Sequence, residues 1–233
     1  FEGGLVQRTR YDLENYLVAD DALRVDKWAG LLGAWNVRYL LAYSNFANYT
    51  VHAEYPADPF FGTSLKVYEN PKVLPRAFFS STVTYISRTQ DLIERMKSPS
   101  WDPRKEVFTQ NVQQQSDAGL LETSDDTVQI TRYENEFVEM KVEPTKKGIL
   151  VFSDLYYPGW HAFIDGKETN IFPVNMIQRG VIVPADSHII TWEYRPTLFY
   201  IGLAISSVSV ILITIWLLIW FYFYKGYRYE AIA

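Results

Sequence analysis

The sequence predicts a small α+β region, then an all-β, jelly-roll-like sandwich, and finally one C-terminal transmembrane α-helix. Helix-like and strand-like patterns mix in the first half, whereas short alternating strands separated by turn residues dominate after Thr127. The stretch from Leu198 to Tyr224 carries no charge and is long enough to cross a bilayer. We therefore expect an α+β region at 1–109, a polar linker at 110–126, the sandwich at 127–196, the membrane helix at 197–224 and a cytoplasmic tail at 225–233.

Composition excludes several classes of function. The chain has 233 residues, a formal net charge of −5 and no cysteine. Nucleic acid is not an expected partner, because phosphate binding needs clustered Lys and Arg. The lack of cysteine excludes thiolate catalysis, disulfides and cysteine-ligated metals. We expect no cofactor and no metal site in this chain.

The first region is predicted to alternate helices and strands. Asp20 or Asp21 could cap a helix over 22–35 that Asn36 ends. Residues 44–63 combine Asn, Pro, Gly and aromatics, which is typical of an irregular loop. We further expect strands at 37–42, 65–69, 77–86 and 106–109 and a short helix at 90–97.

The second region is predicted to be entirely β. Strands at 127–133 and 137–142 alternate, and Gly148–Leu155 is a nearly continuous apolar run. Asp165-Gly166 supplies the two positive-φ positions of a type I′ turn, which predicts a hairpin over 162–168. We expect a second hairpin over 181–194.

The apolar tail is expected to span a bilayer, with aromatics gathered at both of its ends. Lys225 and Arg228 follow it, and only Arg195 stands just before it. The positive-inside rule therefore places the tail in the cytoplasm and the large N-terminal part outside the cell. Because Phe1 begins no signal peptide, we expect upstream sequence with further membrane spans.

An ordered set of motifs runs along the chain. It comprises Tyr68-Glu69-Asn70-Pro71, Leu74-Pro75-Arg76-Ala77-Phe78, Asp102-Pro103-Arg104-Lys105, Leu150-Val151-Phe152-Ser153-Asp154, Tyr156-Tyr157-Pro158-Gly159-Trp160, Ile164-Asp165-Gly166-Lys167, Arg179-Gly180-Val181, Val183-Pro184-Ala185 and Tyr194-Arg195-Pro196. The set resembles the C-terminal region of the bacterial YfhO-type membrane proteins over most of residues 36–224.

The resemblance implies a larger parent protein. YfhO-type proteins are similar to multi-spanning GT-C-type glycosyltransferases, which transfer a sugar from a polyprenyl-phosphate donor to an acceptor outside the cell. Their catalytic acidic residues lie between early membrane helices, which would precede Phe1. The resemblance therefore implies no catalytic residue here, and a bacterial cell-membrane location. The expected partners are the lipid bilayer, the upstream transmembrane region of the same protein, and a glycan or cell-wall polymer.

The densest candidate binding feature is the segment Tyr156–His161. Pro158-Gly159 suits a type II turn, which would display aromatic rings at the edge of the sandwich. Aromatic faces stack on sugar C–H groups through their negative π surface. Two interpretations stay open: a glycan platform, or rings that close the end of the core. The candidate residues are Tyr156, Tyr157, Trp160 and His161.

Other candidate chemistry is weak. His52, His161 and His188 lack metal-ligand spacing, and His188 is expected to be solvated beside a turn. Asp154 and Asp165 could act as a carboxylate pair only if they faced each other across a cleft. The open hypotheses are the non-catalytic outer domain of a membrane glycosyltransferase, a single-pass anchored glycan-binding module, and a structural subunit of a membrane complex.

Overall fold

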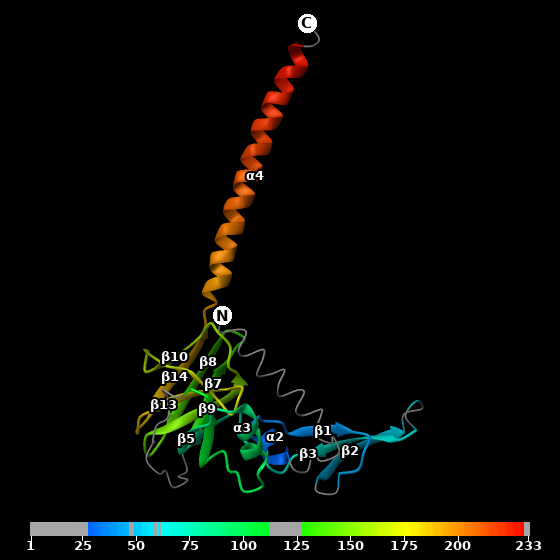
Figure 1. The fold of residues 1–233 in the computed structure, drawn as a ribbon, viewed down its shortest axis with the longest axis vertical. Helices are drawn as coiled ribbons and strands as arrows, with labels where there is room; N and C mark the ends of the chain where they lie inside the picture. The colour runs from blue at the N-terminus through cyan, green and yellow to red at the C-terminus, as the bar shows by residue number, and fades with distance from the viewer. Residues whose placement is uncertain (1–27, 47–48, 58–59, 61, 112–126, 231–233) are drawn as a thin grey trace. The chain divides into compact units, whose positions relative to one another are not determined.

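The computed structural model describes residues 28–46, 49–57, 60, 62–111 and 127–230, with side chains up to Tyr222. Its contacts divide the chain into two units, Phe1–Tyr194 and Arg195–Ala233. Figure 1 shows the elements, which are α2 (Ala29–Ala34), β1 (Tyr39–Ala42), β2 (Thr50–Ala57), β3 (Ser64–Glu69), β4 (Ala77–Ser80), β5 (Thr82–Tyr85), α3 (Thr89–Lys97), β6 (Glu106–Thr109), β7 (Thr127–Tyr133), β8 (Phe137–Glu143), β9 (Gly148–Leu155), β10 (Trp160–Ile164), β11 (Lys167–Thr169), β12 (Phe172–Val174), β13 (Gln178–Val183), β14 (His188–Tyr194) and α4 (Thr197–Glu230).

Two antiparallel sheets form the predicted sandwich. One has the strand order β11-β10-β14-β8-β7 and the other β12-β13-β9-β4. Their facing side chains make one core, to which Met140 and Trp192 contribute from the first sheet and Leu150, Phe152 and Val181 from the second. Burial of these apolar surfaces is the main stabilising term of the fold.

Strand β9 is central to the architecture. Residues Ile149–Phe152 are fully buried, with alternate side chains in two different cores. Burial on both faces explains why β9 is a continuous apolar run instead of an alternating one. The second core, on the outer face of the four-stranded sheet, includes Val83 from β5 and Val107 from β6.

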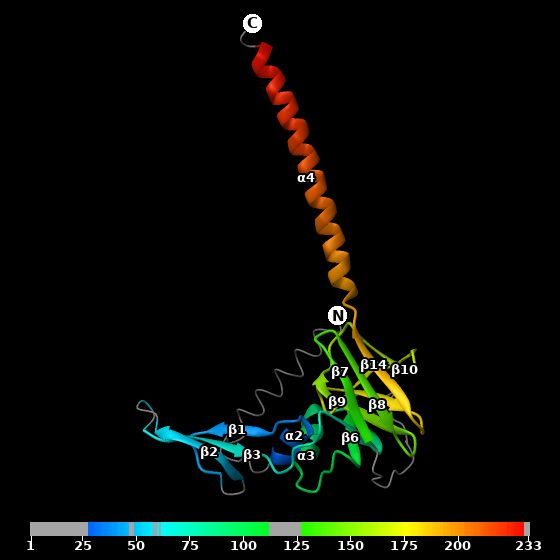
Figure 2. The ribbon, with the colours of Figure 1, turned by 180° about the vertical axis from the view of Figure 1, so that it is seen from behind.

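The helices fill the space beside these sheets. Leu31 of α2 and Leu92, Ile93 and Met96 of α3 are buried against Phe108 of β6. The three-stranded sheet β1-β3-β2 continues on the other side of α2, and Figure 2 shows it projecting beyond that helix. A small cluster of buried side chains, Ala29, Tyr49 and Tyr68, joins α2 to this sheet, and the side chain of Asn70 donates to the carbonyl of Ala29 at 3.1 Å.

Three local predictions were wrong. Residues 44–63 contain a strand, β2, which pairs with β3 through two register irregularities. Because bulges break its alternation, the strand pattern is hidden in the sequence. The expected strand 77–86 is two strands, since β4 pairs with β9 and β5 pairs with β6 in a separate sheet. The predicted small α+β region thus supplies one strand to the sandwich.

The third error concerns the expected hairpin over 181–194. Strand β13 pairs with β9 and β12, whereas β14 pairs with β8 and β10. The connection therefore crosses from one sheet to the other. Asp186 has φ 87° in this crossing, and its N–H bonds to the carbonyl of Pro144. The first predicted hairpin is confirmed, since Asp165 and Gly166 have φ 51° and 79° between β10 and β11.

Helix α4 is the expected membrane-type helix. Its apolar span, Thr197–Tyr222, has 26 residues and extends about 39 Å at the usual rise, which exceeds the roughly 30 Å hydrocarbon core. Ser207, Ser209 and Thr214 donate hydrogen bonds to carbonyls one turn back, at 2.8, 2.9 and 2.8 Å. These bonds satisfy the hydroxyls within the helix, as lipid requires. The predicted cap at Asp20–Asp21 and most of the linker lie outside the described residues.

Candidate functional site

The aromatic segment forms the predicted tight turn between β9 and β10. The N–H of Trp160 donates to the carbonyl of Tyr157 at 3.5 Å, and Gly159 has φ 100°. That positive φ is the conformation that a type II turn requires and that glycine accepts at little cost. Tyr157 is 42% exposed and Tyr156 is half-buried. The turn thus presents one aromatic side chain, Tyr157, plainly to solvent.

Trp160 is held against the protein on its core side. The guanidinium carbon of Arg179 lies 3.9 Å from the centre of its ring, and the Tyr194 ring is 5.4 Å away. Its side chain packs against the core between the two sheets. A guanidinium at this distance occupies one π face of the indole, so that face cannot also stack on a sugar.

Arg179 is a buried cation at the end of the inter-sheet core. Only 4% of the residue is exposed, and its guanidinium lies between Trp160 and Phe152, 5.4 Å from the latter ring. Its Nε donates to the carbonyl of Leu155 at 2.9 Å, whereas Nη1 has no hydrogen-bond partner among the described residues. Burial lowers the pKa of Arg179 to about 10, so the side chain stays charged at neutral pH.

Asp154 and Tyr133 interact electrostatically with this cation, and Arg76 binds both of them. Arg76 donates to the hydroxyl of Tyr133, which donates to Asp154 Oδ2 at 3.2 Å. Arg76 also forms an ion pair with Asp154 at 3.7 Å. Burial and the Asp154 charge raise the pKa of Tyr133, so its hydroxyl keeps its proton. The cluster links β7, β9 and β13 at one end of the sandwich.

His161 lies on the opposite face of β10 from Trp160. Side chains alternate along a strand, and Trp160, Ala162 and Ile164 face the core. The Nδ1 atom of His161 is 2.6 Å from Glu168 Oε1 on the neighbouring strand β11. The structure thus brings Trp160 together with Arg179, and His161 together with Glu168. The expected site residues Trp160 and His161 therefore do not share a surface.

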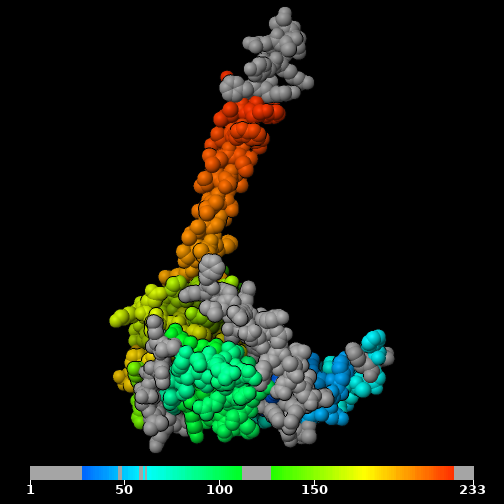
Figure 3. All heavy atoms as spheres, in the orientation of Figure 1, coloured from blue at the N-terminus to red at the C-terminus, as the bar shows by residue number. Residues whose placement is uncertain are grey.

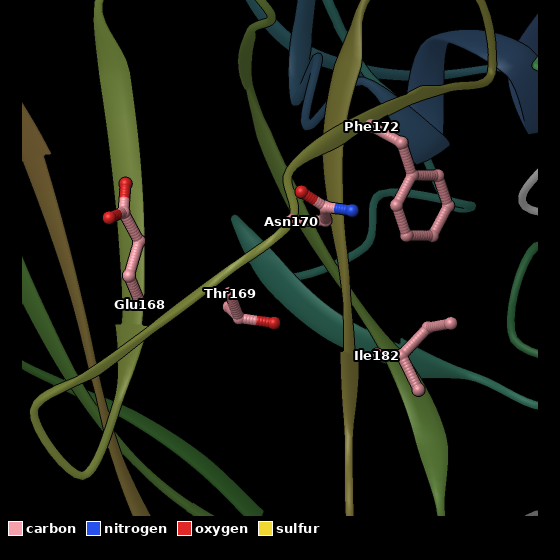
Figure 4. Close-up of a pocket in the computed structure, with 5 residues that line it drawn as sticks. All are labelled: Glu168, Thr169, Asn170, Phe172 and Ile182. Carbon is pink, nitrogen blue, oxygen red and sulfur yellow. The ribbon is translucent and has the colours of Figure 1, made fainter.

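A pocket with a volume of about 610 Å³ lies beside Glu168 (Figure 4). Thr169 and Asn170, from the end of β11 and the connection to β12, present a hydroxyl and an amide, while Phe172 and Ile182 supply apolar surface. The volume is within the usual range for small-ligand sites, which combine apolar walls with a few polar groups. The amide of Asn170 and the hydroxyl of Thr169 make no hydrogen bond with any described residue.

Glycine at position 180 allows the wall of this pocket to form. Gly180 pairs with Phe172, and a Cβ at this position would lie 3.2 Å from the Phe172 ring and 2.9 Å from Val174. Such contacts are too close, so a side chain here would displace both neighbours. Arg179 and Gly180 therefore act on opposite faces of β13. Arg179 places a buried cation on the inner face, and Gly180 leaves space for the Phe172 ring on the outer face.

The two candidate carboxylates are engaged in separate interactions. Asp154 binds Arg76 and Tyr133, whereas Asp165 accepts from the N–H of Ile189 and pairs with His188. His188 is therefore not simply solvated, because its ring bonds to Asp165 at 2.6 Å and to the carbonyl of Ala185 at 3.0 Å. Across the described residues, no group of three or more His, Asp and Glu side chains is arranged to hold a metal.

One comparison with known proteins identifies a relationship. Residues 107–206 match the family model described as bacterial membrane protein YfhO. The resemblance to YfhO-type proteins is thereby confirmed for this segment, which runs from β6 through the sandwich into the first turns of α4. The YfhO match and the apolar helix α4 together support a membrane location. The YfhO motifs before residue 107 lie outside the matched range. No curated protein and no solved structure gives a significant match.

Sequence reasoning did not find the residues of the pocket or the role of Arg179. Thr169-Asn170 is an ordinary polar pair in a short connection, so only the fold of β11 and β12 reveals what it lines. Arg179 stands between polar and apolar neighbours, and nothing local to it predicts its burial. The one available signal was Gly180 inside a strand pattern, which often marks a close approach of neighbouring groups.

Proposed function

We propose that this chain is the non-catalytic outer domain and last membrane helix of a glycosyltransferase that uses a polyprenyl-phosphate-linked sugar. In this proposal the domain contacts the acceptor, a glycan or cell-wall polymer, outside the bacterial membrane. The observation that carries the proposal is the YfhO match, which is continuous from the sandwich into α4. Strand β14 ends only two residues before that helix, so the sandwich is tethered directly to its membrane segment.

The pocket beside β11 supports the acceptor-binding part of the proposal. Sugars present many hydroxyls and an apolar ring face, and the pocket offers the carboxylate of Glu168, the amide of Asn170 and the side chain of Ile182. Tyr157, in the turn before β10, offers an exposed ring. Trp160 contributes mainly to the packing of the sandwich, because Arg179 and Tyr194 lie against it.

The test is a transfer assay with membranes that contain the native protein, a polyprenyl-phosphate sugar donor and increasing acceptor glycan. The variant Asn170→Ala should raise the KM for the acceptor several-fold and leave kcat nearly unchanged, because it removes binding without touching the chemistry. The matched control is Gln129→Ala, which removes an exposed amide from β7. An unchanged KM in Asn170→Ala would overturn the role of the pocket.

A second candidate, a single-pass anchored glycan-binding module, follows from the same pocket and helix. It predicts that the native protein binds oligosaccharides in titration calorimetry but transfers no sugar. Transfer that stops when the protein is absent would exclude this candidate. A protein that neither binds glycans nor transfers sugar would overturn both proposals and favour a structural subunit, which should then co-purify with other membrane chains in mild detergent.

A further inference from the structure

A second pocket lies at the C-terminal end of α3, between that helix and β6. Its volume is about 260 Å³, and its lining includes Arg95, Ser98, Ser100, Trp101 and Lys105. The segment from α3 to β6 belongs to the broad green surface that faces the viewer in Figure 3. This pocket shares no lining residue with the one beside β11.

The cations of this pocket are not neutralised within the described structure. The guanidinium carbon of Arg95 lies over the ring of Phe108, 6.0 Å from its centre, and neither Arg95 nor Lys105 makes an ion pair or a hydrogen bond through its side chain with any described residue. By contrast, Lys66, Arg76, Arg132 and Lys141 each lie within 4.0 Å of a carboxylate.

The carboxylates of the pocket are held by other groups. Glu106 Oε1 accepts a hydrogen bond from Thr84 at 2.5 Å, and Asp102 Oδ1 accepts one from the N–H of Arg104 at 3.0 Å. Each carboxylate is thus hydrogen-bonded to a group other than the two cations. The formal charges of the four side chains cancel, so the pocket has no net charge but keeps its positive groups available.

The side chains that line the pocket have unused hydrogen-bond donors, which favours a ligand that is rich in acceptors. The hydroxyls of Ser98 and Ser100 are 2.8 Å apart, so one donates to the other and the second keeps its hydrogen for another partner. The indole N–H of Trp101 is used by the carbonyl of Glu106 at 2.9 Å. All guanidinium donors of Arg95 and all ammonium donors of Lys105 are unused among the described residues.

We infer that this pocket binds one oxyanion group, a carboxylate or a phosphate, carried by a small polar molecule. Charge-assisted hydrogen bonds from Arg95 and Lys105 would hold the anion, the free serine hydroxyl would add a third donor, and Trp101 would form an apolar wall beside it. The volume suits a ligand group of about one sugar ring. The inference is independent of the proposed glycosyltransferase function, because it concerns a different pocket.

The test is a titration of the whole chain in an uncharged maltoside detergent, followed by the indole N–H signal of Trp101 in NMR spectra. Trp101→Phe assigns that signal. Inorganic phosphate, glucuronate and glucose serve as the three probes. Phosphate or glucuronate should shift the signal saturably, whereas glucose should not. A response to phosphate alone identifies a phosphate site, and a response to glucuronate alone identifies a carboxylate site.

The variants make the test specific. Arg95→Gln and Lys105→Gln should each weaken binding about ten-fold, and the double variant should abolish saturation. Arg104→Gln is the matched control, because it removes a neighbouring exposed cation that does not line the pocket and should bind as the unsubstituted chain does. Added salt should weaken binding through screening. A shift that does not saturate, an equal response to glucose, or an equal loss in Arg104→Gln would overturn the inference.

Discussion

The sandwich and the three-stranded sheet β1-β3-β2 both contain apolar and aromatic side chains. These side chains are buried in the sandwich, whereas many are exposed in the three-stranded sheet. In the sandwich, β9 buries Ile149–Phe152 completely, because other layers lie on both of its faces. In the three-stranded sheet, β2 is exposed along nearly all its length, and Tyr39, Leu41 and Tyr55 are 41%, 66% and 55% exposed. The comparison teaches that apolar and aromatic residues of similar kinds occur in both strands, whereas their burial depends on the layers that pack against each strand.

The largest expected effect is in the sandwich core. Trp192 is fully buried, and its ring lies 5.5 Å from that of Phe152. Trp192→Ala should lower the free energy of unfolding by about 3–5 kcal/mol, because it removes this packing and leaves a cavity. Chemical denaturation in detergent, followed by far-UV circular dichroism, measures the change.

The matched control is Trp192→Phe. The indole N–H of Trp192 has no hydrogen-bond partner among the described residues, so removing it breaks no hydrogen bond. This variant should therefore lower the free energy of unfolding by less than half as much as Trp192→Ala does. Equal losses would show that the core does not depend on filling this volume.

The next effect concerns the buried cation at the end of the sandwich. Arg179→Ala should destabilise the domain by about 2–3 kcal/mol, because it removes the contacts with Trp160 and Phe152 and the bond to Leu155. Arg179→Met keeps most of the packing without a buried charge and should stay within about 1 kcal/mol of the unsubstituted protein. If Arg179→Met destabilised the domain as much as Arg179→Ala, the charge would be the stabilising element and the packing argument would be wrong.

A smaller and more local effect is expected in the three-stranded sheet. The hydroxyl of Tyr68 donates to the carbonyl of Ser44 at 3.0 Å and accepts from the N–H of Phe46 at 3.4 Å. Tyr68→Phe should cost about 1 kcal/mol. Hydrogen exchange should become faster in β1 and β3 but not in β9, because the sheet and the sandwich have separate cores.

Exposed Leu41 supplies the control for that prediction. Leu41→Ser should change stability by less than about 0.5 kcal/mol, since two-thirds of this side chain is already exposed. A change in the exchange of β9 in Tyr68→Phe would mean that the two regions unfold together.

The smallest effect is a pH dependence at one turn of the sandwich. The hydrogen bond from His188 to Asp165 raises the pKa of His188 above its ordinary 6.5 and lowers that of Asp165 below its ordinary 3.8. The histidine contribution is complete below pH 6.5 and is lost as the pH rises through its raised pKa. The aspartate contribution is complete above pH 3.8 and is lost as the pH falls through its lowered pKa.

Stability from this pair should therefore be greatest between about pH 4 and 6.5, and Tm should fall by about 1–2 °C on moving to pH 8. Differential scanning calorimetry of the protein and of His188→Gln measures it. The variant should lose that part of the pH dependence; an unchanged profile would show that the pair contributes nothing.

Much of the fold could be predicted from local signals. The apolar run of β9, the Asp165-Gly166 turn and the uncharged stretch 198–224 of helix α4 each need only neighbouring residues to be recognised. Strand β2 was missed because the bulges in its pairing with β3 hide its alternation, whereas the crossing between β13 and β14 was missed because it is decided by pairing partners that are distant in sequence. The division into domains and the role of the aromatic turn stay predictions.

The candidate site was less predictable for the same reason. The turn at Gly159 is local and was predicted, but Trp160 meets Arg179 only because β10 and β13 belong to facing sheets. His161 was singled out for its neighbours in sequence, whereas its actual partner is Glu168 across the hairpin. Tertiary contacts, not composition, distinguish the residues that close the core from those that line a pocket.

The central claim is that a folded sandwich is carried on one lipid-spanning helix, α4. Flotation of the whole chain with liposomes, followed by alkaline carbonate extraction, tests it most directly. We expect the protein to float with the vesicles and resist extraction, and a variant with Val208→Arg and Leu212→Arg to lose both properties, because charges at the centre of a span are costly. Recovery of the unsubstituted chain in the aqueous fraction without detergent would contradict the claim.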